Sequence, residues 1–326
     1  MLRFRPKQEA SASQSPRQSK LKLVLHVGPH KTGTSSLQWA LLDQYSAKRP
    51  QKIWYPKPSS LGPGHALAAH ASLELGSSAR EPFLKDWIEA AQQSACETLV
   101  VSAEALSAAY PDKVGKLAAQ TEDCDVHLVF TLTPISRRSM SLWQGKVKHR
   151  FDQPLDAAGE DVLNSPGLAA DLIQVFADAF PGAKISVIVV NRQSPLDLYR
   201  RFAEATGIPL VPPQESSELV VNRSLGQIEA EMVRSFNLSV AQLDLSDEDY
   251  RAGLRLLREL LTSEAWQAAV PNLPLALPGD WVEPLAERCA ATVANLRKLA
   301  AAGRIEILGD IDSLNDIDVV RRLTRA

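Results

Sequence analysis

One short stretch limits what this chain can fold into more than any other part of it. Residues 21–42 read LKLVLHVGPHKTGTSSLQWALL, in which the continuous apolar run 23–25 has the length of a short buried strand. A loop with two glycines follows, and Leu37, Ala40 and Leu41 then recur at the spacing of one helix face. The pattern predicts a strand, a tight turn and a helix, in that order.

The predicted turn has the chemistry of an anion-binding site. The first backbone N–H groups of a helix have no partner within it, and the helix dipole is positive at that end. Gly28 and Gly33 let the backbone approach a ligand closely, Lys31 adds a charge, and residues 34–36 add hydroxyl donors. We therefore expect the loop to hold a phosphate or sulfate group. The plainer interpretation is a βα turn that happens to contain a lysine.

The position of the lysine separates this loop from a nucleoside triphosphate loop. The pattern GxxxxGK(S/T) places lysine directly after the second glycine. Here Gly28 and Gly33 keep the glycine spacing, but Lys31 stands two residues before Gly33, and Thr34 follows it. The sequence thus departs from the triphosphate pattern at the residue that matters most for it.

The motif HKTGT followed by SLQ, at residues 30–34 and 36–38, resembles the phosphosulfate-binding loop of the sulfotransferase family, most closely its bacterial members. The resemblance covers roughly residues 21–210 and extends weakly beyond them. It implies an α/β fold of the P-loop type, with a central parallel sheet between layers of helices. It also implies binding of 3′-phosphoadenosine 5′-phosphosulfate (PAPS) without a metal.

The same resemblance implies roles for the residues of the loop. Lys31 would hold the 5′-phosphosulfate and neutralise the charge that develops on the leaving phosphate, so it would also be catalytic. The cofactor-binding cradle would consist of His30, Lys31, Thr32, Gly33, Thr34, Ser35 and Ser36.

Two residues are candidates for the catalytic base. Glu104 follows the predicted strand 98–102, and ligands of open parallel sheets bind outside the carboxyl ends of the strands. The resemblance implies that this glutamate takes the proton of the acceptor, although an acid in the first turn of a helix would look the same. His65, which follows Gly64 where a helix begins, is the other candidate, or a packing histidine.

The site for the 3′-phosphate of PAPS departs from the family. The resemblance implies a serine in the helix after strand 126–131, which Ser141 matches, and an arginine eight residues earlier, where Thr133 stands. One lost charge-assisted contact would cost about 1.5–3 kcal/mol. Arg137 or Arg138, in the first turn of that helix, is a candidate to replace the charge, and Thr133 could still donate a hydroxyl; a solvated helix face explains the two arginines equally well. Arg223 is a further candidate, although a helix cap at Asn222 or Ser224 is the simpler interpretation there.

Basic residues continue the same helix. Lys146, Lys148 and His149 lie in the segment QGKVKHR at residues 144–150. Such a stripe beside the cofactor would suit an acidic or polar acceptor, or the phosphates of PAPS. An exposed helix end with cations near its C-terminus explains the same residues.

Composition narrows the class of protein. The 326 residues carry a formal net charge of −2, which argues against broad electrostatic binding to nucleic acid. No apolar run approaches the roughly 18 residues of a membrane span, and the N-terminus lacks the apolar core of a signal peptide. Three scattered cysteines suit reduced thiols, so we expect a cytoplasmic protein.

We expect three parts along the chain. Residues 1–20, rich in Ser, Gln and basic side chains, predict a disordered tail. Residues 21–212 predict the α/β core, and residues 213–326 a mainly helical region that packs on it. The core strands are expected to begin near Leu21, Ile53, Thr98, Val126 and Lys184.

The function expected from the resemblance is transfer of a sulfuryl group from PAPS to a hydroxyl, or an amine, of a small-molecule or carbohydrate acceptor. One alternative is a P-loop kinase or nucleotide hydrolase, which would need an acidic magnesium ligand. Another is a non-catalytic nucleotide-binding protein of sulfotransferase-like fold, which Thr133 makes more credible.

Overall fold

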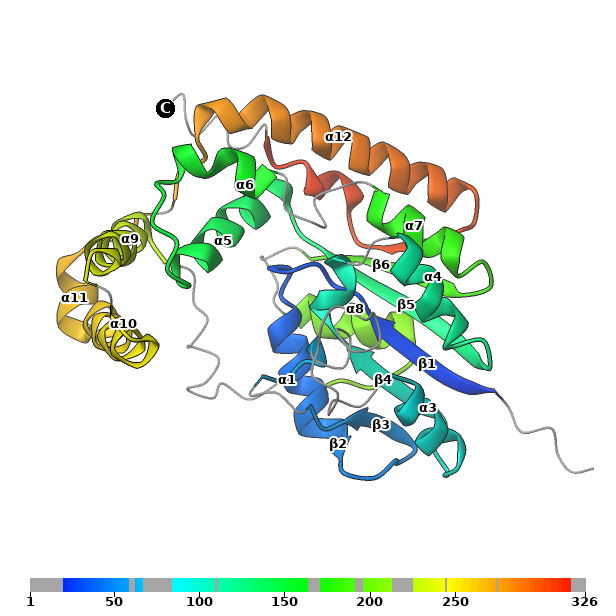
Figure 1. Cartoon of the computed structure of the whole chain (residues 1–326). Coiled ribbons are helices and arrows are strands. Elements are labelled where there is room, and N and C mark those ends of the chain that lie inside the picture. Colours follow the sequence, from blue (N-terminus) through cyan, green and yellow to red (C-terminus); the bar gives the residue numbers. More distant parts are fainter. Residues whose placement is uncertain are drawn as a thin grey trace, which may run out of the picture.

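A seven-stranded sheet forms the centre of the computed structural model (Figure 1), with the strand order β2-β3-β4-β1-β5-β6-β7. Every strand pair in the described part of the chain is parallel. The strands are β1 (Leu21–His26), β2 (Ser46–Ala47), β3 (Ile53–Pro56), β4 (Thr98–Ser102), β5 (Cys124–Leu132), β6 (Lys184–Val189) and β7 (Glu306–Leu308). The structure describes residues 20–58, 62–66, 84–108, 111–163, 171–190, 196–212, 225–243, 245–273 and 275–317.

Helices cover both faces of this sheet. The helices of the described residues are α1 (Thr34–Tyr45), α3 (Leu84–Gln92), α4 (Pro111–Ala119), α5 (Ile135–Val147), α6 (Gly159–Leu163), α7 (Asp171–Ala179), α8 (Leu196–Thr206), α9 (Gln227–Ala241), α10 (Asp247–Thr262), α11 (Glu264–Ala269) and α12 (Gly279–Ala301). Short 3₁₀ turns complete the described elements: η1 (Glu104–Ala108), η2 (Asp156–Ala158) and η4 (Ile311–Leu314). The observed architecture confirms the α/β class expected from the sequence.

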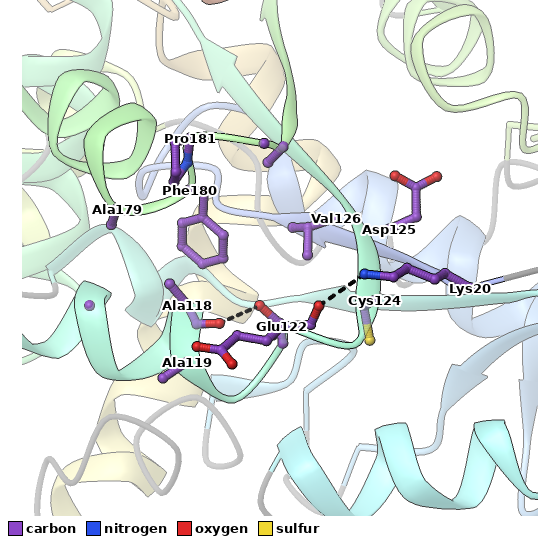
Figure 2. Close-up of a pocket in the computed structure, with 14 residues that line it drawn as sticks. Lys20, Ala118, Ala119, Glu122, Cys124, Asp125, Val126, Ala179, Phe180 and Pro181 are labelled. Atoms are coloured by element: carbon purple, nitrogen blue, oxygen red, sulfur yellow. Dashed lines mark hydrogen bonds between the residues drawn. The ribbon is translucent and has the colours of Figure 1, made fainter.

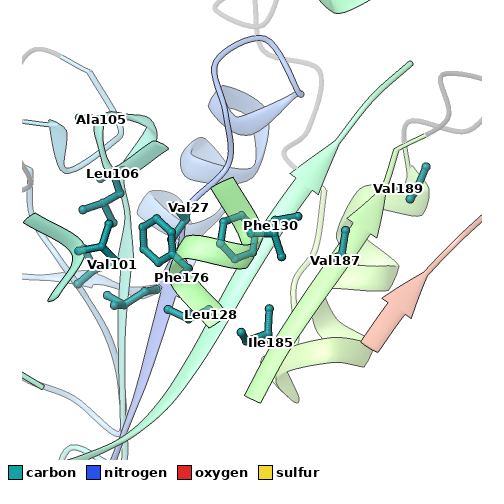
Figure 3. Packing of buried hydrophobic residues seen from close by; sticks show 14 of the residues in the cluster. Val27, Val101, Ala105, Leu106, Leu128, Phe130, Phe176, Ile185, Val187 and Val189 are labelled. Carbon is teal, nitrogen blue, oxygen red and sulfur yellow. The ribbon is translucent and has the colours of Figure 1, made fainter. Parts of the chain in front are cut away.

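The strands are apolar on both faces because helices bury both faces. In β1, Leu23 and Leu25 belong to the cluster under α3, α4, α5, α7 and α12. Val24, between them, belongs to the second cluster, under α1 and α8. Figure 3 shows part of the larger cluster, in which Phe130 of β5 meets Phe176 of α7 edge to face at 5.5 Å between ring centroids.

The expected core strands are all present, and β1 confirms the strand predicted before the loop. The C-terminal region contributes one strand besides its helices. This strand, β7, pairs in parallel with β6, with Ile307 opposite Val187, so residues beyond 212 extend the sheet itself. Residues 1–19 of the expected disordered tail lie outside the described residues.

The helices of the C-terminal region fall into two groups. Figure 1 shows α9, α10 and α11 together at one end of the molecule, beyond α5, while α12 runs along the layer that contains α7. Ser246 caps α10, because its hydroxyl accepts the N–H of Asp249 at 3.1 Å.

The helices that follow the neighbouring strands β1 and β5 pack on opposite faces of the sheet. The helix after β1, α1, packs on one face through Leu37 and Leu41. The helix after the neighbouring strand β5, α5, packs on the other face through Ile135 and Trp143. Ligands of open parallel sheets bind at such a change of direction, and the loop 27–33 lies there.

Candidate functional site

The loop between β1 and α1 leaves the helix N-terminus open to a ligand. Gly33 is the N-cap of α1 in the left-handed conformation, with φ of 85°, and it brings no capping side chain. Lys31 also has a positive φ, of 70°, which is uncommon for a residue other than glycine. The first N–H groups of α1 therefore remain available for an anion.

The side chain of Lys31 crosses from the loop to α5. A Cβ atom placed on Gly145 would lie 2.8 Å from Cε of Lys31 and 3.2 Å from its Nζ. The glycine thus makes room for the lysine. Ser141 precedes Gly145 by one turn on the same face of α5, so the lysine amine lies on the side of the helix that presents this serine.

Glu104, at the start of η1, lies directly beside the loop. One of its carboxylate oxygens accepts a hydrogen bond from the hydroxyl of Thr34, and the other pairs with Nδ1 of His30. The side chain of Glu104 is 19% exposed, while that of His30 is 55% exposed. The carboxylate is therefore fixed at the tip of α1, next to the first turn, but stays within reach of solvent.

An arginine of α5 supports the loop from below. Arg138 is 4% exposed, and its Nε donates to the backbone oxygen of His30 at 3.0 Å. Burial lowers the pKa of Arg138 to about 10, and the charge of Glu104 acts in the opposite direction. Arg138 therefore stays charged near neutral pH and adds a fixed positive charge beneath the loop.

The remaining residues proposed for the 3′-phosphate lie on the same strand–helix unit. Thr133 is half-buried just after β5, and Ser141 is half-buried in α5. Arg137 is half-buried as well and precedes Ser141 by four residues, which places both on one face of the helix. Arg223 lies outside the described residues.

Besides the hydroxyl of Thr34, two more hydroxyls of this segment are used within the protein. Thr32, which is 2% exposed, donates to the backbone oxygen of Pro29 at 2.8 Å and therefore shapes the loop. The hydroxyl of Ser36 donates to the oxygen of Gly33 at 2.9 Å. Ser35 is exposed beside the helix start. The backbone N–H groups are thus the main donors that this segment offers to an anion.

His65 has a packing environment. Its ring is 2% exposed and lies between Tyr55, at 4.3 Å, and Trp87, at 4.9 Å between centroids. Nδ1 accepts the N–H of Ser102 at 3.1 Å, and Nε2 donates to the oxygen of Pro56 at 2.7 Å. Burial lowers the pKa of His65 to about 4, against the hydrogen bond to Pro56. Because both ring nitrogens are occupied, the geometry favours the packing interpretation and leaves Glu104 as the candidate base.

A buried polar network beneath the loop was not predicted. Nδ1 of His26 lies 2.7 Å from the hydroxyl of Ser102, and its Nε2 lies 3.3 Å from that of Thr131. Thr131 contacts the hydroxyl of Thr32 at 2.8 Å, and Gln38 donates to Ser102 at 3.1 Å. The ends of β1, β4 and β5 are thereby joined to the loop and to α1. The only sequence signal is a polar residue at the end of each apolar run.

Gly28 serves this network. A Cβ atom there would lie 2.4 Å from Cγ2 of Thr34, 2.5 Å from Oγ1 of Thr131 and 2.8 Å from Nε2 of His26. The sequence had suggested that Gly28 lets the backbone approach a ligand. In the structure this glycine is required because protein side chains pack against it.

A cavity of about 810 Å³ lies at the other end of the sheet (Figure 2), beside the start of β5 and the ends of α4 and α7. Its walls include Glu122, Cys124 and Phe180, and Lys20 donates to the backbone oxygen of Glu122 at 3.3 Å. Since the loop 27–33 is at the carboxyl ends of the strands, this cavity is separate from the candidate site.

In the described residues, no helix combines the length and the apolar character needed to cross a membrane. The same residues contain no group of three or more His, Cys, Asp or Glu side chains arranged to hold a metal ion. The expectation that no metal takes part stays a prediction.

No protein-family model matches the chain, and no curated protein matches its sequence. Among solved structures, a sulfotransferase from Alicyclobacillus acidocaldarius is similar over 72% of this chain and 99% of that chain, with 15% sequence identity and a TM-score of 0.41. This similarity is too weak to support a conclusion about the chain. The fold assignment therefore depends on the observed sheet and helices.

Proposed function

We propose that this protein is a sulfotransferase that transfers a sulfuryl group from PAPS to a hydroxyl, or an amine, of a small-molecule or carbohydrate acceptor. One observation carries the proposal. Lys31 precedes the glycine-capped N-terminus of α1 by three residues, and the carboxylate of Glu104 accepts the hydroxyl of Thr34, the first residue of that helix. A helix end suited to an anion, a cation and a candidate base thus belong to one loop and the residue beside it.

The donor set supports a ligand with anions at two positions. The N–H groups at the start of α1 and Lys31 suit the 5′-phosphosulfate. Ser141 and Arg137, on one face of α5, suit the 3′-phosphate, and Thr133 adds a hydroxyl. In this proposal, Arg137 would supply the charge that an arginine at position 133 supplies in the family.

PAPS supplies the sulfuryl group, and the chain supplies alignment and charge. Lys31 and the N–H groups of α1 would neutralise the charge that gathers on the leaving phosphate. Glu104 would take the proton of the acceptor as its oxygen or nitrogen bonds to sulfur and the bond from sulfur to the phosphate oxygen breaks. Thr34 and His30 orient the carboxylate, so it needs little rearrangement.

One contact favours a second candidate. The hydroxyl of Thr34 and the carboxylate of Glu104 are hydrogen-bonded beside the helix start. A hydroxyl and an acid in this position are also what a magnesium nucleotide site requires. A P-loop kinase or hydrolase would use them with magnesium, whereas the sulfotransferase would not need the metal.

Calorimetry with 3′-phosphoadenosine 5′-phosphate (PAP), the product of transfer, tests the proposal. We expect micromolar binding without magnesium, because the phosphate sites use only N–H, hydroxyl and cationic donors. Lys31→Ala should weaken binding about tenfold or more and abolish transfer. Lys48→Ala removes an exposed lysine beyond the other end of α1 and should change neither. A strict requirement for magnesium would favour the kinase, and undetectable PAP binding would refute the transferase.

A further inference from the structure

A continuous series of hydrogen bonds connects α1 to the anion-binding loop through the interior of the protein. Its members come from α1, from the ends of β4, β1 and β5, and from the loop. In order they are Gln38, Ser102, His26, Thr131, Thr32 and the backbone oxygen of Pro29. We call this series the polar chain. Its side chains are 6% exposed or less, so its polar groups depend on one another for hydrogen bonds.

The loop end of the polar chain fixes the direction of its hydrogen bonds. The backbone oxygen of Pro29 can only accept, and the hydroxyl of Thr32 donates to it at 2.8 Å. A hydroxyl has one proton, so Thr32 must accept in its other contact, from the hydroxyl of Thr131 at 2.8 Å. Thr131 has then used its own proton and can only accept from Nε2 of His26, at 3.3 Å.

The next step of the polar chain follows from the chemistry of His26. A neutral imidazole carries one proton, so a ring that donates through Nε2 accepts through Nδ1. Nδ1 therefore accepts the hydroxyl proton of Ser102, at 2.7 Å. Burial lowers the pKa of His26 to about 3, which agrees with a neutral ring at pH 7.

The α1 end of the polar chain agrees with this order. Ser102 has given its proton to His26 and needs a donor at its remaining contact. The amide nitrogen of Gln38, which can only donate, lies there at 3.1 Å. Both ends thus require the same order, in which each group donates toward the loop. The reverse order would need a proton on the backbone oxygen of Pro29.

The loop end of the polar chain holds backbone that an anion would contact. Thr32 holds the oxygen of Pro29. Arg138 holds the next backbone oxygen, that of His30, at 3.0 Å. In a trans peptide unit the N–H points opposite to the C=O, so these contacts also set the directions of the N–H groups of His30 and Lys31. Lys31 has a φ of 70°, a strained conformation that persists only where surrounding contacts maintain it.

We propose that His26 is a positioning residue for the anion-binding loop: as a neutral ring with its proton on Nε2, it orders the hydroxyl protons of Thr131 and Thr32, and this order holds the loop in shape. Since His26 is fully buried, it acts on the loop only through Thr131. The expected effect on PAP binding rests on the proposed function, whereas the proton order and the shape of the loop do not.

Nitrogen NMR of the full-length protein, labelled with ¹⁵N-histidine and studied at pH 7 without a ligand, tests the proton order. The signals of His26 are identified by nuclear Overhauser contacts with the ring of Phe202, whose centroid lies 6.2 Å from that of His26. Nε2 should give the resonance of a protonated nitrogen, and Nδ1 that of an unprotonated one. A proton on Nδ1, a mixture of the two tautomers or a charged ring would overturn the inference.

Two substitutions of Thr131 test its action on the loop. Thr131→Val keeps the shape of the side chain without the hydroxyl, so the amide resonances of residues 30–33 should shift, and PAP binding should weaken about tenfold. Thr131→Ser keeps the hydroxyl, so the loop resonances should stay close to those of the wild type, and PAP affinity should stay within about threefold. A serine variant that behaves like the valine variant would contradict the inference.

Thr121→Val is the matched control. Thr121 is 2% exposed, and its hydroxyl donates to the backbone oxygen of Ala118 at 2.9 Å, at the end of the sheet away from the loop. Its loss should change neither the loop resonances nor PAP affinity. Unchanged loop resonances in Thr131→Val, or equal effects of the two valine substitutions, would show that the hydroxyl of Thr131 is only structural. If PAP does not bind the wild type, the proposed function fails, and the NMR measurements still decide the inference.

Discussion

Acidification from pH 8 to pH 5 should destabilise the fold through three buried histidines, His26, His65 and His127. All three are 3% exposed or less. Burial lowers the pKa of His26 to about 3 and those of His65 and His127 to about 4; Lys184 and Lys22 also contribute at His127. In the unfolded chain each imidazole returns to its ordinary pKa, about 6.5.

The sign follows from which state binds the protons. Between pH 6.5 and the folded pKa values, the unfolded chain is protonated at these histidines and the native protein is not, so acid favours unfolding. The stabilisation is fully present above pH 6.5 and is lost as the pH falls toward 4. Each unit below 6.5 costs about 1.4 kcal/mol per histidine, which gives about 2 kcal/mol each at pH 5 and about 6 kcal/mol in total. That is comparable with the roughly 5–15 kcal/mol stability of a typical native protein.

Urea denaturation at constant ionic strength, between pH 8 and pH 5, measures this loss. Near pH 5 the free energy of unfolding should fall by about 4 kcal/mol per pH unit, equivalent to nearly three protons taken up. His127→Gln, in which an amide can still reach the hydroxyl of Ser186, should reduce the uptake to about two. A free energy of unfolding that stays constant from pH 8 to pH 5 would refute the reasoning.

Three further predictions concern the site. Gly145→Ala places a methyl group 2.8 Å from Cε of Lys31 and should displace the lysine side chain, which weakens PAP binding about tenfold. The melting temperature should not fall, because alanine has the higher helix propensity. Unchanged PAP affinity in calorimetry would show that PAP binding does not depend on the position of Lys31 beside Gly145. Glu104→Gln should reduce turnover in a radiolabelled transfer assay about 100-fold or more, with PAP binding nearly intact, since a general base contributes about 10²–10⁴-fold; unchanged turnover would remove Glu104 from the mechanism. Thr133→Arg should tighten PAP binding by restoring a charge, and weaker binding in calorimetry would mean that the 3′-phosphate site is built differently.

The sequence was informative where one local pattern decides the outcome. Apolar runs predicted the core strands, because a strand that is covered by helices on both faces is apolar at nearly every position. Glu104 was placed near the loop because residues that follow neighbouring parallel strands meet at one edge of the sheet. Both conclusions need only the order of elements along the chain.

Contacts between residues that are distant in the sequence could not be predicted from local patterns. His26 stands in an apolar run, and nothing local shows that Ser102 and Thr131 will meet its two nitrogens. His65 follows a glycine at a helix start, but Tyr55 and Trp87 enclose it. These pairings depend on strand order, which periodicity alone does not give.

The sequence did not show which of two adjacent arginines of α5 reaches the loop, because this depends on how the helix is rotated about its axis. Arg137 and Arg138 point about 100° apart on α5, a difference set by packing against the sheet. Only Arg138 is nearly fully buried and reaches the oxygen of His30. Sequence alone did not fix the rotation of the helix and so could not decide which arginine reaches the loop.

The left-handed backbone of Lys31 has a consequence for how this protein can change. A side chain at a φ of 70° costs of order 1 kcal/mol relative to glycine, which adopts that conformation freely. Selection for stability alone would therefore favour glycine at this position and give a more stable protein that lacks the lysine of the loop. Retention of the lysine in a related sequence therefore indicates that the loop still binds an anion.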